Sequence, residues 1–247
     1  INASDSTTAA AGGSASSSAC QLAINGGNLI ITAGGDGIDS NGSLAITGGV
    51  VLVSTASNGN GALDYDSTGT ITGGIVIAAD TGSMSENFTT DSTQGALLVS
   101  VGSQSAGTRV TLTGADGSVI ASYTPTTSYN TVVISAPAMT QGSSYTVSVG
   151  GTAEADASGF ASSGALSGRT EVSTATLDSL ITGSGTGMGG MGGMGAMAGG
   201  HTGGGRMGAA GPGMTADGTT GATTTDNAGG GTAATDGVSG ATTGSGN

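Results

Sequence analysis

The residues best suited to chemistry lie in two short acidic runs whose matching positions are 25 residues apart. Asp36 and Asp39 belong to the first run, and Asp64 and Asp66 belong to the second. No histidine or cysteine accompanies them, so the oxygen donors favour a hard cation such as Ca²⁺ over zinc or copper. Asp and Asn are also common turn formers, and each residue taken alone could serve only its turn.

The acidic runs belong to a longer repeat. Residues 22–32 align without gaps to residues 44–54, and residues 70–78 form a third copy. The Gly-Gly pairs at 26–27, 48–49 and 73–74 are separated by 22 and 25 residues. Short β-rich segments with this period predict the coils of a right-handed parallel β-helix. A leucine-rich horseshoe has a similar period, but its Leu-x-x-Leu-x-Leu signature is missing.

Stacked coils place equivalent side chains in columns, because neighbouring strands lie about 4.8 Å apart. Asn2, Asp39 and Asp64 are expected in one column, with Asn41 and Asp66 in a second. Carboxylates this close repel unless a cation lies between them. We therefore predict a calcium site, with candidate ligands Asp36, Asp39, Asp64, Asp66, Asn41 and Asn2.

Tyr65, between the two acids of the second run, is the candidate sugar contact. Exposed aromatic rings are scarce in this chain, in which aromatic residues make up 2%. Asn58 and Asn60 precede Tyr65 and are the other candidate polysaccharide contacts. Tyr65 could equally be a packed corner residue, and the sequence leaves both interpretations open.

Apolar columns indicate where the core lies. Columns 29/51/76 and 31/53/78 are expected to point inward together, because side chains alternate along a strand. Column 30/52/77 then faces outward, yet it reads Ile-Leu-Ile. Because an outward apolar ladder is normally covered, we expect another part of this chain to lie over it.

The sequence divides into three parts. Residues 1–94 are the predicted β-helix coils, and residues 184–247 form a Gly/Met/Thr-rich tail predicted to be disordered. Between them, residues 95–183 are predicted to form a small antiparallel, sandwich-like β cap. Its expected strands are 96–101, 109–113, 119–123, 131–135 and 145–149, with a further strand within 170–180. Because the chain opens at the end of one coil, we also expect coils upstream of Ile1.

Composition excludes several function classes. Sixteen acidic residues face only three arginines, so the formal charge is -13, which disfavours nucleic acid as a partner. No stretch approaches the length of apolar sequence that crosses a bilayer. Cys20 is the only cysteine, so no disulfide forms within the chain.

The run ITAGGDGIDSNGSLAITGGVVLVSTASNGNGALDYDSTGTITGGIVIAADTGSM resembles the last coils of a family of extracellular carbohydrate-binding parallel β-helix proteins. The resemblance extends to about residue 181. It implies a pectate-lyase-like fold, calcium binding and association with plant cell-wall polysaccharides, without established catalysis. On this resemblance the GDGID motif maps to Asp36 and Asp39, and the LDYD motif to Asp64 and Asp66. Most of the family's coils are absent here, and residues 184–247 extend past the similar region.

The sequence therefore predicts a monomeric, secreted or cell-surface bacterial protein that binds acidic or cellulosic polysaccharide through calcium. A structural or adhesive surface role is the alternative. Catalysis as a polysaccharide lyase would need a strong base, typically Arg or Lys, beside the calcium. Lysine is absent, and Arg109, Arg169 and Arg206 all lie outside the predicted coils, so we expect no enzymatic activity.

Overall fold

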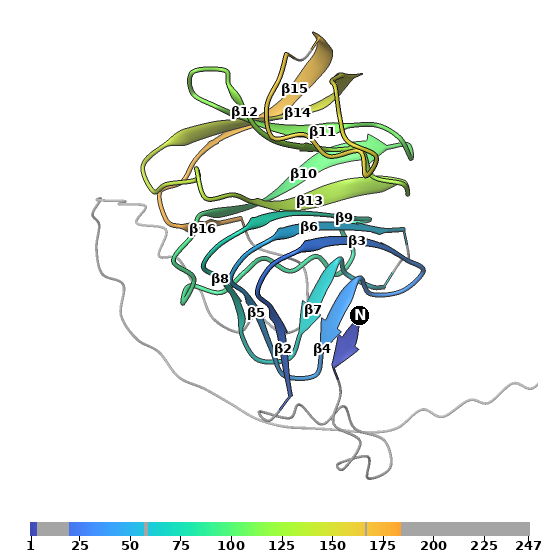
Figure 1. Cartoon of the computed structure of the whole chain (residues 1–247), viewed down its shortest axis with the longest axis vertical. Helices are drawn as coiled ribbons and strands as arrows, with labels where there is room; N and C mark the ends of the chain where they lie inside the picture. Colours follow the sequence, from blue (N-terminus) through green and yellow to red (C-terminus); the bar gives the residue numbers. More distant parts are fainter. Residues whose placement is uncertain (4–19, 57–58, 166, 184–247) are drawn as a thin grey trace, which may run out of the picture. The chain divides into compact units, whose positions relative to one another are not determined.

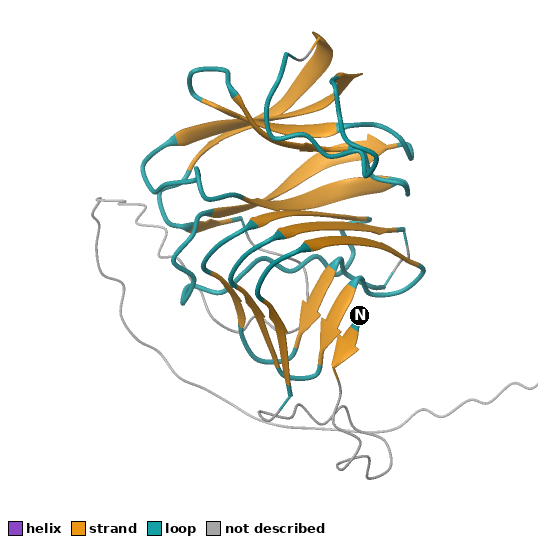
Figure 2. Cartoon of the chain, viewed as in Figure 1, coloured by secondary structure: helices purple, strands orange, loops and turns teal. Residues whose placement is uncertain are grey.

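The structure is a computed structural model that describes residues 1–3, 20–56, 59–165 and 167–183. All regular elements in these residues are β-strands (Figure 2), and the described part contains no helix that could cross a membrane. The predicted all-β class is confirmed, with both parallel and antiparallel sheets. The predicted disordered tail lies outside the described residues.

Three parallel ladders build the N-terminal part of the chain, from Asn2 to Asp80, and the chain visits them in turn (Figure 1). The first contains β1 (Asn2–Ala3), β4 (Ile38–Ser40) and β7 (Leu63–Tyr65). The second contains β2 (Gln21–Ile24), β5 (Ser43–Ile46) and β8 (Gly69–Ile71). The third contains β3 (Asn28–Ala33), β6 (Val50–Thr55) and β9 (Ile75–Asp80). Each passage through the three ladders is one coil.

The register of these ladders is the register of the sequence repeat. Leu22 pairs with Leu44, Leu29 with Val51 and Val51 with Val76. Both predicted inward columns line one apolar core, in which Val51, Val53, Val76 and Ala78 are fully buried, as are Ile46 and Ile71 from the second ladder. Their burial supplies the hydrophobic stabilisation of the coils.

Glycines at the corners let successive coils stack closely. Gly49 and Gly74 have φ values of 92° and 90°, a region that glycine enters at little cost. A Cβ atom on Gly49 would lie 2.5 Å from the Gly27 carbonyl oxygen, and one on Gly74 would lie 2.7 Å from that of Gly49. Gly49 and Gly74 are therefore required by both backbone conformation and space.

Some strands of residues 95–183 join the third parallel ladder, and the others form a separate sheet. β10 (Ala96–Gln104), β13 (Tyr129–Ser135) and β16 (Ile181–Thr182) extend the third ladder, with β13 antiparallel to β9. The sheet order is β16-β10-β13-β9-β6-β3. Sequence reasoning predicted strands near these positions but not that they would continue the ladder.

A second, four-stranded antiparallel sheet is made by the remaining strands. Its order is β12-β11-β14-β15, from β11 (Val110–Gly114), β12 (Val119–Tyr123), β14 (Ser144–Thr152) and β15 (Ser167–Thr176). A turn at Asp116 joins β11 to β12, with Gly117 at a φ of 80°.

The outward apolar column is covered by this second sheet, which confirms the expectation for two of its three members. Leu52 and Ile77 are buried in a core shared with Leu112, Tyr123 and Val147. A hydrogen bond of 2.8 Å between the buried Ser54 Oγ and Tyr123 Oη also links the two sheets. Ile30, on edge strand β3, stays 54% exposed.

Candidate functional site

The parallel register places the predicted polar column in one row. Asn2 pairs with Asp39 across β1 and β4, and Asp39 pairs with Asp64 across β4 and β7. Asn2 Nδ2 donates a short hydrogen bond to Asp39 Oδ2. The three residues therefore stand on adjacent strands, as the repeat spacing predicts.

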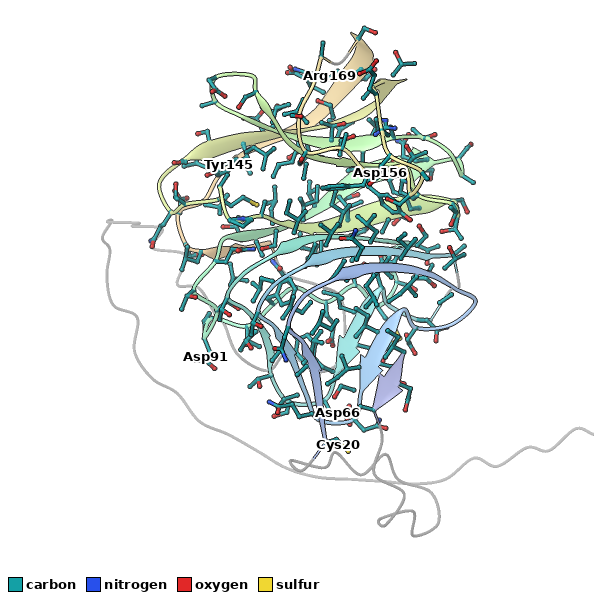
Figure 3. The ribbon with its side chains drawn as sticks, viewed as in Figure 1. Cys20, Asp66, Asp91, Tyr145, Asp156 and Arg169 are labelled. Carbon is teal, nitrogen blue, oxygen red and sulfur yellow. The ribbon has the colours of Figure 1, made fainter. Side chains whose placement is uncertain are left out.

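The second predicted column continues the same ladder beyond the strand ends. The Asn41 N–H donates to the Ala3 carbonyl at 2.9 Å, and the Asp66 N–H donates to the Ser40 carbonyl at 3.1 Å. These backbone contacts keep the coils aligned past β4 and β7. Asp66 is exposed, and Figure 3 places it on the parallel ladders, away from the second sheet that carries Arg169.

Burial and neighbouring carboxylates raise the pKa values of Asp39 and Asp64. Burial is the main cause for Asp64, whose pKa rises to about 6, and Asp36, Asp39 and Asp66 add repulsion. Burial likewise raises the pKa of Asp39, while the hydrogen bond from Asn2 opposes the rise. The folded protein thus disfavours the charged form of both column carboxylates.

Glu86 is a member of this cluster that sequence reasoning missed. Its Oε2 accepts a hydrogen bond of 3.2 Å from the Tyr65 N–H. Burial, together with Asp64, Asp66 and Asp36, raises its pKa to about 7, against a lowering by the Tyr65 hydrogen bond. Residues 81–94 lack the repeat motif, so no spacing signal pointed to Glu86. It lies in an incomplete last coil, where Thr89 N–H still donates to the Gly69 carbonyl at 2.6 Å.

Asp36 occupies a different position from the column. Its Oδ1 accepts a hydrogen bond of 2.8 Å from the Gly61 N–H of the next coil. Asn60, beside Gly61, has its Oδ1 3.8 Å from where a Cβ of Gly35 would lie, so it borders the same corner. Asn58 lies outside the described residues.

Tyr65 is engaged in packing. Its hydroxyl donates a short hydrogen bond to the Asn87 carbonyl, and a Cβ on Gly69 would lie 2.3 Å from its Cε1 atom. Burial raises the pKa of the phenol. The ring therefore covers Gly69, and only its remaining surface is open to a sugar. A sugar contact at Tyr65 stays a prediction.

The donor chemistry of the column suits calcium, but its carboxylates do not converge on one point. Carboxylate and amide oxygens are the ligands that Ca²⁺ prefers. Within the described residues, however, no three Asp, Glu, His or Cys side chains form a group that could hold a metal ion. The structure thus shows the row of donors and its repulsion, without a formed coordination sphere.

Neither described arginine belongs to the acidic column. Arg109 precedes β11, is buried, and donates to Ser122 Oγ at 2.6 Å and to the Gly159 carbonyl at 3.3 Å. Arg169 lies on β15 of the second sheet.

In comparisons with protein-family models, curated proteins and solved structures, the chain has no significant match.

Proposed function

We propose that the chain is a non-catalytic polysaccharide-binding module whose three ladders are the three faces of a right-handed parallel β-helix. The protein acts at the bacterial surface or outside the cell, as a monomer, on acidic or cellulosic plant cell-wall glycans. Calcium links the acidic column to the sugar. The observation that supports this proposal best is the alignment of Asn2, Asp39 and Asp64 on three adjacent strands.

Calcium supplies positive charge where the column has too little. Asp39 and Asp64, with Asp36, Asp66, Asn2 and Asn41 around them, would provide the protein oxygens. A uronate carboxylate would otherwise be repelled by a chain with a formal charge of -13. A shared cation turns that repulsion into attraction, because it accepts oxygen ligands from both partners.

Glu86 joins this proposal as an additional acidic residue near the column. Burial is the main cause of its raised pKa, and Asp64, Asp66 and Asp36 raise it further. Removing a proton from Glu86 would become easier once a cation neutralised its neighbours. Calcium binding is therefore expected to release protons near neutral pH.

Among the described residues no arginine lies beside the column, which supports binding over lyase chemistry. β-Elimination needs a group that removes a proton from the sugar ring. In the part of the chain that the structure describes, Arg109 is held by Ser122 and Gly159, and Arg169 lies on the second sheet. A structural or adhesive role, with calcium only stiffening the coils, is the second candidate, since the same column would serve it.

Affinity electrophoresis tests the proposal. We expect polygalacturonate in the gel to retard the protein in calcium and not in chelator. Absorbance at 235 nm should stay flat, because no unsaturated sugar forms. Calcium-dependent melting without retardation in polygalacturonate or hydroxyethylcellulose would contradict polysaccharide binding and favour the structural role. A rise at 235 nm would contradict the non-catalytic assignment.

A further inference from the structure

A second candidate site is a groove of about 530 Å³. It is formed by the segment that follows β9, by β10 and β13, and by the residue after β16. This volume falls within the range typical of small-ligand pockets. None of its lining residues carries a formal charge. Six have hydroxyl or amide side chains, namely Thr81, Ser85, Ser100, Ser103, Asn130 and Thr131. We call this the hydroxyl groove.

One wall of the hydroxyl groove is held in place by a buried carboxylate. Asp80 is 1% exposed, and its Oδ1 accepts hydrogen bonds from the Gly82 N–H at 2.8 Å and from the Ser85 hydroxyl. Its Oδ2 accepts a third, of 3.1 Å, from the Ala62 N–H. Asp80 therefore fixes the wall formed by Gly82 and Ser85, and a preorganised wall loses little entropy when a ligand binds.

Next to this wall, β13 and β10 offer polar groups that the protein does not use. Thr131 Oγ1 donates to Asn130 Oδ1 at 3.0 Å, which orients the Asn130 amide. Among the described residues, neither Asn130 Nδ2 nor the exposed Ser103 hydroxyl has a protein partner. Gly82 packs directly against this pair, because a Cβ there would lie 2.5 Å from Asn130 Oδ1 and from Thr131 Oγ1.

We infer that the hydroxyl groove binds an uncharged segment of glycan, independently of calcium. An ionic ligand would find no counter-charge among the lining residues, whereas a neutral sugar presents hydroxyl groups that both donate and accept. Leu98 adds an apolar surface for the face of a sugar ring. The ligand class rests on the proposed polysaccharide function, but the binding step needs none of the acidic residues of the column.

The hydroxyl groove and the acidic column are connected by consecutive residues. Ser85 lines the groove, and Glu86 accepts from Tyr65 beside the column. One glycan chain could therefore meet uncharged hydrogen-bonding groups at the groove and the calcium-bridged acids at the column. This arrangement gives the module two separable contributions to affinity.

Calorimetry on the full chain separates the contributions of the hydroxyl groove and the acidic column to glycan affinity. Cellohexaose is the neutral probe and oligogalacturonate the acidic probe, and each is measured in calcium and in chelator. The groove variant is Asn130→Ala with Ser103→Ala. Its matched control is Asn28→Ala with Ser162→Ala, two exposed residues away from the groove. Melting temperatures of both variants establish that they fold.

We expect cellohexaose to bind the original chain equally well in calcium and chelator, and the groove variant to bind it at least about tenfold more weakly. The control variant and Asp39→Ala with Asp64→Ala should bind cellohexaose normally. Unchanged cellohexaose affinity in a folded groove variant, or no cellohexaose binding by the original chain, would overturn the inference. If the original chain bound cellohexaose but showed no calcium-dependent binding of oligogalacturonate, the proposed role of the column would be contradicted instead.

Discussion

Asp39 and Asp64 are direct partners in the parallel ladder between β4 and β7. Each has a pKa raised first by burial and further by the surrounding acids. Such a pair weakens the fold whenever both groups are charged, because like charges on adjacent strands repel. The repulsion ends when a proton or a cation neutralises the row, and the two means of neutralisation can be tested separately.

The first prediction concerns the cation. Calcium should raise the melting temperature of the original chain at pH 7.5, because a ligand that binds only the folded state stabilises it. Asp39→Ala with Asp64→Ala should remove most of this rise, since it deletes the two paired carboxylates. Differential scanning fluorimetry across a calcium titration measures the effect.

Asp91→Ala is the matched control, because Asp91 is exposed and its carboxylate is absent from the acidic cluster. It should preserve the calcium response. An undiminished response in the double variant would show that calcium binds elsewhere.

The second prediction concerns protons, in chelator. The folded-state pKa values of Asp64 and Glu86 are about 6 and about 7, whereas unfolded carboxyl groups titrate near 4. Between these values the folded chain binds more protons, so its unfolding free energy falls as pH rises. The melting temperature should therefore be higher at pH 5 than at pH 8, by on the order of 5 °C.

Asp64→Asn with Glu86→Gln removes both titrations and should flatten this part of the pH profile. Asp116→Asn and Asp156→Asn are controls that should leave the slope between pH 5 and pH 8 unchanged. Hydrogen bonds from Ser118 and Ser158 lower the pKa values of these two exposed acids, so their contribution to stability is lost only below about pH 4. A pH profile that is as steep in the double variant as in the original chain would assign the dependence to other groups.

The coils could be predicted from sequence because, in a stacked repeat, residues at equivalent positions of successive repeats lie side by side on adjacent strands. A gapless match between residues 22–32 and 44–54 becomes a strand pairing residue by residue, as Leu22 with Leu44 shows. The same reasoning placed Asp39 beside Asp64. It also indicated that Leu52 and Ile77 needed a cover, because an apolar residue in an outward column has no place in the coil's own core.

What lay outside the repeat could not be predicted in this way. The antiparallel pairing of β13 with β9 is a non-local contact with no periodic signal. Glu86 reaches the acidic cluster from a segment whose motif has been lost, through its hydrogen bond with Tyr65. The hydroxyl groove gathers residues from four segments, and Ser100 and Asn130 carry no mark in the sequence that separates them from other polar strand residues.

The third prediction compares two members of the outward column. Leu52 is 1% exposed beneath the second sheet, whereas Ile30 is 54% exposed on edge strand β3. Leu52→Ala should lower the unfolding free energy by about 2–5 kcal/mol, because it leaves a cavity in the shared core. Ile30→Ala should cost less than about 1 kcal/mol. Urea unfolding measures both, and equal losses would mean that the second sheet does not cover the column in solution.

The fourth prediction tests the stacking of the coil corners. Gly74 and Gly117 both have positive φ values, of 90° and 80°, so alanine at either position carries the same backbone penalty of about 1–2 kcal/mol. Only at Gly74 would the new Cβ meet another coil, 2.7 Å from the Gly49 carbonyl oxygen. A Cβ on Gly117 would meet no atom within 4 Å. Gly74→Ala should therefore destabilise the chain by at least about 2 kcal/mol more than Gly117→Ala in urea unfolding. If Gly74→Ala lowered the unfolding free energy less than Gly117→Ala, close contact between the coil corners would be contradicted. The in-register column of Asn2, Asp39 and Asp64 would then lack the spacing on which the calcium proposal depends.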